Sequence, residues 1–117
     1  MKWPLLVAAF ALSCCPVYAQ LRDDPTTGHG YLKICSREED DWRSACNFYS
    51  AGMNNMLLAI DMIAGGQRVE CSPGHTTLAD KRRVFLAFLE ANPDLQHLGS
   101  PVLYIRALYE AFPCPAR

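Results

Sequence analysis

Apolar residues recur at spacings of three and four through the middle of this chain. From residue 42 to residue 64, one helical face would collect the large apolar side chains and one cysteine: Trp42, Cys46, Tyr49, Met53, Met56, Leu57, Ile60 and Ile63. This spacing is typical of an amphipathic helix that buries one face. Gly65-Gly66 follows directly, and glycine commonly ends a helix. The pattern therefore predicts a long helix over residues 42–64.

Shorter helices are predicted around the long one from residues that begin and end helices. Threonine or aspartate can accept the free backbone N–H groups of a first turn, and proline fits a first helical position. The predicted boundaries are Thr26 or Thr27 to Cys35, Asp40 or Asp41 as the cap of the long helix, Thr76 or Thr77 to Asn92-Pro93, one more turn at Leu95 to Leu98, and Ser100-Pro101 to Pro113. No segment alternates apolar and polar residues as a strand would. We therefore expect an all-α domain, a small bundle of about four to five helices.

The same pattern predicts which side chains fill the core. Besides the face of the long helix, these are Leu78, Phe85, Phe88 and Leu89 in the third helix and Val102, Leu103, Leu108, Ala111 and Phe112 in the last. Met53, Met56 and Met62 are expected to fill gaps in the core. Gly52 inside a helix costs about 1 kcal/mol relative to alanine, so we expect another helix to pass close to it.

The first nineteen residues have the composition of a secretory signal peptide. Lys2 supplies the positive start, residues 4–12 the short apolar segment, and residues 17–19 the small-residue cleavage site. The apolar segment is too short to span a bilayer, which takes about 20 residues. Cleavage after Ala19 would leave residues 20–117 as a single domain in the periplasm.

Four cysteines lie beyond this leader, each near the end of a predicted helix: Cys35, Cys46, Cys71 and Cys114. In a short exported chain such a set is normally a disulfide framework. Of the three pairings, their positions favour Cys35–Cys46 and Cys71–Cys114, which would close loops contributing about 3 and 4 kcal/mol. The short Cys-x-x-Cys or His-x-x-x-His spacings typical of zinc sites do not occur in residues 20–117.

Charge and motifs exclude several classes of function. Without Lys2 the chain has ten basic and twelve acidic residues, a net charge of −2. A nucleic-acid-binding protein requires a basic surface, so this class of function is not expected. No later apolar run is long enough for a membrane span. The scattered histidines, His29, His75 and His97, accompany no nucleophile motif, phosphate loop or metal motif. We therefore expect no catalytic residues, no metal and no cofactor.

Two charged runs are the other candidates for function. Residues 38–41 form a contiguous acidic run. Carboxylates in such a run would be solvated, so burial could not raise the pKa of one of them as it does for a catalytic acid. The simplest interpretation of this run is a charge cluster at the start of a helix, and the alternative is an electrostatic docking site. Residues 81–83, Lys-Arg-Arg, are expected to be a solvated helix face, with a partner contact or a pairing across subunits as the alternative.

Several of these motifs, in this order, resemble the Rap/Tai immunity proteins of bacterial type VI secretion. The motifs are Cys46-x-x-Tyr49-x-x-Gly52, Cys71-Ser72-Pro73, a capped helix ending at Asn92-Pro93, and Ala111-Phe112-Pro113-Cys114. The resemblance covers roughly residues 30–114. It implies a periplasmic helical protein, often a homodimer, that binds a peptidoglycan amidase effector and blocks its cleft. It implies fold-determining roles for the motif residues and identifies no contact residue.

We expect the contact surface at residues 38–42 and at residues 65–74. The specific candidates are Glu39, Asp40, Asp41 and Trp42, because an exposed tryptophan beside charges is a typical interface anchor; burial of Trp42 in the core is the alternative. Two other functions remain open. A periplasmic stress protein or chaperone would bind many clients through exposed apolar surface, and a small envelope lipoprotein would be acylated at Cys14.

Overall fold

The computed structural model describes residues 23–116, so the predicted leader and its cleavage site lie outside the described residues. Within this range the chain forms α1 (Gly28–Cys35), α2 (Asp40–Ile63), α3 (Leu78–Ala91), a 3₁₀ turn η2 (Pro93–Leu95) and α4 (Ser100–Ala111). No residue from 23 to 116 lies in a β-strand; there is one isolated bridge between Thr27 and Gly99. The predicted all-α fold is confirmed.

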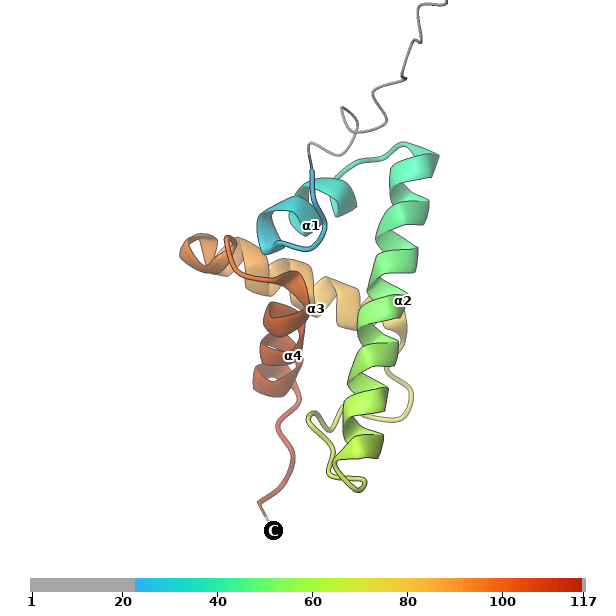
Figure 1. Cartoon of the computed structure of the whole chain (residues 1–117), viewed down its shortest axis with the longest axis vertical. Helices are drawn as coiled ribbons and strands as arrows, with labels where there is room; N and C mark the ends of the chain where they lie inside the picture. The colour runs from blue at the N-terminus through green and yellow to red at the C-terminus, as the bar shows by residue number, and fades with distance from the viewer. Residues whose placement is uncertain (1–22, 117) are drawn as a thin grey trace, which may run out of the picture.

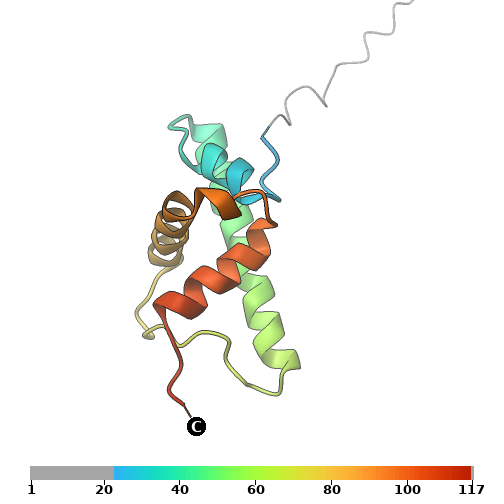
Figure 2. The ribbon, with the colours of Figure 1, turned by 90° about the vertical axis from the view of Figure 1, so that its left-hand side faces the viewer.

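The long helix α2 runs along one side of the bundle, and all three other α-helices contact it. Figure 1 shows α1 at the upper end of α2, α4 facing its lower half and α3 crossing behind. Figure 2 shows the segment between α2 and α3 running along the lower end of the bundle, past the end of α4. This arrangement places two loops, at residues 36–39 and 64–77, at opposite ends of α2.

Local hydrogen bonds at the helix starts explain most of the boundaries. The Thr27 hydroxyl accepts the N–H of Gly30 at 3.1 Å, and Thr77 and Asp80 form the reciprocal capping box of α3. The predicted cap of α2 is wrong by one residue. Glu39 is the N-cap and makes no side-chain capping bond. Asp40 and Asp41 lie in the first turn, where their negative charge faces the positive end of the helix dipole.

The helix ends also follow the predicted signals. Gly65 and Gly66 adopt φ of +70° and +83°, a left-handed conformation that glycine reaches without steric cost. Asn92-Pro93 ends α3 and begins η2, two residues before the expected turn. Proline sits in the first turn of α4, where its missing N–H breaks no intrahelical bond.

The core lies where the four helices meet. Its buried apolar residues are Tyr31, Ile34, Cys46, Met53, Leu57, Phe85, Leu89, Leu103, Tyr104, Ala107 and Leu108. Phe85 at its centre packs against the rings of Tyr31 and Tyr104, with centroids 4.8 and 5.3 Å away. The Tyr31 hydroxyl shares a 2.6 Å hydrogen bond with Ser50, which satisfies both buried groups.

Some predicted core positions are wrong, because the expected apolar faces were too wide. Met62 is 80% exposed and Ile63 87%. Nine residues, or two and a half helical turns, separate Met62 from the buried Met53, so they lie on opposite faces. In α4, Val102 and Ala111 are exposed, while Tyr104 and Ala107 are buried.

Gly52 also differs from expectation. No atom lies within 4 Å of the position that a Cβ would take there, so no helix approaches it. The close approach occurs at Gly30, where a Cβ would overlap the backbone carbonyl of Asp24.

Both favoured disulfides are present. Cys35 and Cys46 join α1 to α2 with their Cα atoms 5.1 Å apart. Cys71 and Cys114 join the loop before α3 to the segment after α4, with Cα atoms 4.9 Å apart. These distances lie within the ordinary range for disulfides.

Substituting the two glycines should have opposite effects on stability. Gly52→Ala should raise the free energy of unfolding by about 1 kcal/mol, because it adds helix propensity in open space. Gly30→Ala should lower it, because the backbone must move away from Asp24. Urea unfolding of the oxidised protein measures both; destabilisation by Gly52→Ala would contradict the open surface described for α2.

Candidate functional site

The acidic candidates form an exposed corner at the start of α2. Glu39, Asp40 and Asp41 are all exposed, and Asp40, 96% exposed, lies 3.6 Å from the Arg43 guanidinium. The Cys35–Cys46 disulfide holds the short connection that leads into this turn. These carboxylates lack the burial that general acid or base chemistry uses, so the corner is suited to contact with a charged surface.

Trp42 is half-buried and packs against the core. The Arg37 guanidinium lies 4.1 Å from the centroid of its ring, a cation–π contact. Arg37 also pairs with Asp23 at 2.5 Å. A hydrogen bond from Lys33, followed by the charges of Lys33 and Arg37, holds the pKa of Asp23 below its usual range, although burial opposes the shift. These contacts fix Trp42 against the corner and cover part of its surface.

The basic run at the start of α3 is divided among three environments, which corrects the expectation of a solvated face. Lys81 is only 12% exposed and pairs with Glu70 at 2.7 Å. Arg82 donates a hydrogen bond to Asn47 of α2. Only Arg83 is fully at the surface, where it pairs with Asp80 at 2.5 Å.

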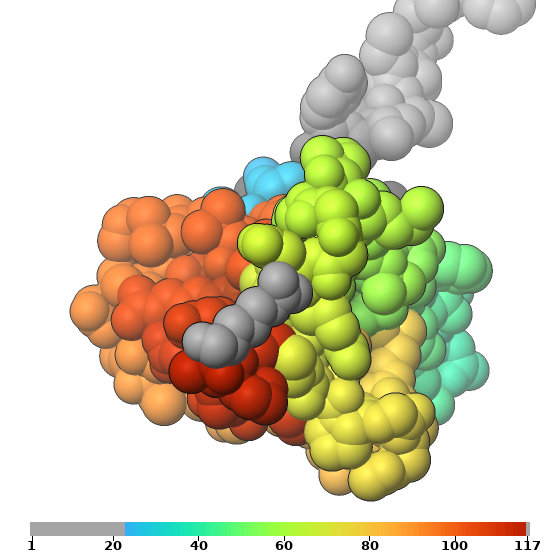
Figure 3. Space-filling view, turned by 90° about the horizontal axis from the view of Figure 1, so that it is seen from below, coloured from blue at the N-terminus to red at the C-terminus, as the bar shows by residue number. Residues whose placement is uncertain are grey.

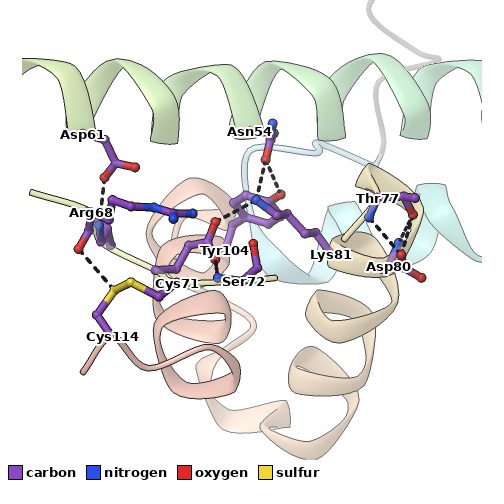
Figure 4. Close-up of polar contacts among 12 residues, drawn as sticks. Asn54, Asp61, Arg68, Cys71, Ser72, Thr77, Asp80, Lys81, Tyr104 and Cys114 are labelled. Atoms are coloured by element: carbon purple, nitrogen blue, oxygen red, sulfur yellow. Dashed lines mark hydrogen bonds and ion pairs between the residues drawn. A yellow bond between two sulfur atoms is a disulfide. The ribbon is translucent and has the colours of Figure 1, made fainter. Parts of the chain in front are cut away.

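The second expected contact loop, residues 65–74, is anchored by a buried carboxylate that sequence analysis did not single out. Glu70 is 4% exposed and accepts hydrogen bonds from Lys81 and from the N–H of Ser72, both at 2.7 Å. Figure 4 shows Lys81 also reaching Asn54 of α2, whose Oδ1 atom accepts a hydrogen bond from Tyr104 of α4 as well. This network therefore joins the loop to three helices.

Further bonds hold the same loop along its length. Asp61 accepts the N–H of Val69 at 2.8 Å, and the N–H of Cys71 donates to the carbonyl of Phe112 at 2.8 Å. A hollow of about 480 Å³ lies between this loop and the carboxyl-terminal segment, lined by Gly66, Gln67, Arg68, Cys71, Cys114, Pro115 and Ala116. Figure 3 views the molecule from this end. The loop can thus present a fixed surface rather than a flexible one.

The two expected contact loops do not form one surface. They lie at opposite ends of α2 (Figure 1), whose 24 residues span about 36 Å. A partner that contacts both loops must therefore extend along the whole length of the bundle.

The outer side of α2 between these loops is uncharged and partly apolar. Its exposed large side chains are Phe48, Leu58, Met62 and Ile63. Asp61 is the one charged residue from position 44 to position 67. Phe48 is 81% exposed and borders a hollow of about 260 Å³ beside Gly52. We call these exposed side chains, with Gly52, the outer α2 strip; sequence analysis assigned Met62 and Ile63 to the core and so missed it.

The described part of the chain, residues 23–116, lacks two features that would indicate other classes of site. No helix in this range is long and apolar enough to cross a bilayer. No three His, Cys, Asp or Glu side chains in the same range come close enough together to hold a metal ion.

Comparison with known proteins places the chain beside a protein family. A family model described as Rap1a immunity proteins matches residues 27–114, a segment that begins at the cap of α1 and ends at Cys114. It includes all four α-helices and both disulfides. Curated proteins and solved structures gave no match.

The buried Glu70–Lys81 pair predicts an acid-dependent loss of stability. Burial alone would raise the pKa of Glu70, but hydrogen bonds from Lys81 and Ser72 outweigh it and lower the pKa. The pair therefore stabilises the fold fully above the unfolded value of about 4.3, and this contribution is lost as pH falls through the lower folded value. Glu70→Gln should cost about 2 kcal/mol at pH 7, because Lys81 loses its charged partner.

Urea unfolding between pH 7 and pH 3 tests this prediction. The difference between wild type and Glu70→Gln should narrow as the pH falls below about 4. Glu90→Gln, which removes an exposed carboxylate from α3, is the matched control. A difference that stays constant over the whole pH range would exclude an ionic role for Glu70.

Proposed function

Because this chain belongs to the Rap1a immunity protein family, we propose that it binds and inhibits a peptidoglycan amidase effector of type VI secretion in the periplasm. Membership of the family implies a secreted effector as the protein partner. The observation that carries the proposal is the extent of the match, which takes in every helix of the described domain and both disulfides.

Export to the periplasm is supported by the disulfides. Two bridges in a small domain are typical of an oxidising compartment outside the cytoplasm. We propose that residues 1–19 act as the signal peptide and that cleavage follows Ala19, on the composition of this segment.

Inhibition by docking suits the rigidity of the domain. Each end of α2 carries a loop fixed by a disulfide, so little conformational entropy would be lost when either loop meets a partner. We propose that the corner of Glu39, Asp40, Asp41 and Trp42 contacts the amidase. These carboxylates are exposed and make no capping bond, so they can be changed without removing a contact of the core.

We further propose that the outer α2 strip joins two copies of the chain into a homodimer. A two-fold interface brings the same patch of both subunits together. Phe48 is exposed beside the hollow at Gly52. The Phe48 ring of one copy can therefore occupy the space beside Gly52 of the other copy, where there is no side chain. The absence of charge over most of the strip avoids like-charge repulsion across the axis.

The central test is inhibition of a peptidoglycan amidase, and the expected candidate is an effector encoded beside this gene, because an immunity gene should sit beside the gene of its toxin. The purified oxidised protein should co-purify with that amidase and suppress its hydrolysis of peptidoglycan. Replacing Asp40 and Asp41 with lysine should weaken the complex about tenfold, because charge complementarity is reversed. The control is Glu90→Lys with Asp94→Lys, the same charge change at exposed positions of α3 and η2.

The outcomes of this test separate the proposed roles. Unchanged affinity in the Asp40/Asp41 variant would remove the corner from the interface. Failure of the wild type to inhibit, together with suppression of aggregation of unrelated proteins, would indicate a chaperone instead.

The dimer is tested by Phe48→Glu. This change should convert the protein to a monomer, as measured by sedimentation equilibrium, because it places a charge on the shared apolar surface. Ala87→Glu, at an exposed position of α3, should leave the mass unchanged. A monomeric wild type would refute the proposal directly.

A further inference from the structure

Four arginines from three parts of the chain line one hollow at the α1–α2 corner. Arg37 follows α1, Arg43 lies in the first turns of α2, and Arg82 and Arg83 lie on α3. The hollow has a volume of about 430 Å³, and the Cys35–Cys46 disulfide forms part of its wall. Glu38 is the one acidic residue of the lining. We call the four guanidiniums and the space between them the arginine pocket.

Existing contacts hold these guanidiniums without using up their donors. Arg37 and Arg83 each pair with a carboxylate at 2.5 Å, and Arg43 with one at 3.6 Å. Those carboxylates, Asp23, Asp80 and Asp40, lie outside the lining of the pocket. Each guanidinium has five N–H donors, so donors remain for a ligand.

Of the four arginines, Arg82 is the most available for binding an incoming carboxylate. Its hydrogen bond goes to the neutral amide of Asn47. No carboxylate of residues 23–116 lies within ion-pair distance of it. An incoming carboxylate would therefore meet a guanidinium whose charge is not already matched by a close partner.

The chemistry of the lining favours a protein partner over a small molecule. Small-molecule sites are lined mainly by apolar side chains, whereas four of the nine residues that line this pocket are arginines. Arginine is enriched at the centres of protein interfaces and binds carboxylates through two parallel hydrogen bonds. Arg37, Arg43 and Arg83 are themselves exposed, so a large partner can reach the pocket.

We propose that the arginine pocket receives an acidic segment of the effector, with one or more Asp or Glu side chains seated among Arg37, Arg43, Arg82 and Arg83. The inference rests on the proposed function. It adds that the partner surface carries both signs, with basic groups facing Asp40 and Asp41 and carboxylates entering the pocket. The acidic run and the basic run thus meet within one chain, at a single binding corner.

Charge reversal at the pocket tests the proposal. Arg82→Glu and Arg43→Glu, made separately, should each weaken binding of the amidase by about tenfold or more, measured by titration calorimetry. Arg106→Glu is the matched control, because Arg106 is an exposed arginine on α4 that lies outside the pocket and pairs with Glu110. Thermal unfolding of each variant establishes that the fold is retained.

Rescue from the partner side gives a second readout. An effector in which an exposed carboxylate is changed to lysine should bind the Arg82→Glu protein better than the wild-type protein, as expected for directly coupled charges. If the wild type inhibits the amidase but Arg82→Glu and Arg43→Glu bind as tightly as Arg106→Glu, the arginine pocket is refuted and the proposed function stands. If the wild type does not bind the amidase, the proposed function itself fails.

Discussion

The two disulfides are the constraint on which the rest of this structure depends. The core contains eleven buried apolar residues, which is modest for a four-helix domain. Bridges that close 11- and 43-residue separations contribute about 3 and 4 kcal/mol by restricting the unfolded chain. Domains of this kind have total stabilities of about 5–15 kcal/mol. The Cys71–Cys114 bridge also holds in place the loop that buries Glu70 against Lys81.

Each bridge also shapes the surface. Cys35 and Cys46 line the arginine pocket, and Cys71 and Cys114 line the hollow at the opposite end of α2. The fold and the proposed recognition surfaces therefore depend on the same covalent links. A loop that a disulfide holds in one conformation keeps its charged groups in position before a partner arrives, which lowers the entropic cost of binding.

Local signals in the sequence were sufficient to predict the fold, but not the arrangement of its surface. Thr77, Gly65-Gly66 and Asn92-Pro93 act on neighbouring backbone groups, so the helix limits could be predicted to within about two residues. The Lys81–Glu70 pair and the arginine pocket depend instead on how α3 crosses α2, which no local pattern specifies. Met62 was misplaced because it was assigned to the core on its apolar character alone, although its position is half a helical turn away from the buried face that contains Met53.

Because its stability depends on both bridges, the protein reaches its full stability only after its cysteines are oxidised. In the reducing cytoplasm the four thiols would stay apart, and the nascent chain would lack several kcal/mol of the stability of its mature form. The reduced chain would therefore unfold more readily than the oxidised bundle. For the exported immunity protein proposed above, protection of the cell would then begin only when the two bridges form outside the cytoplasm.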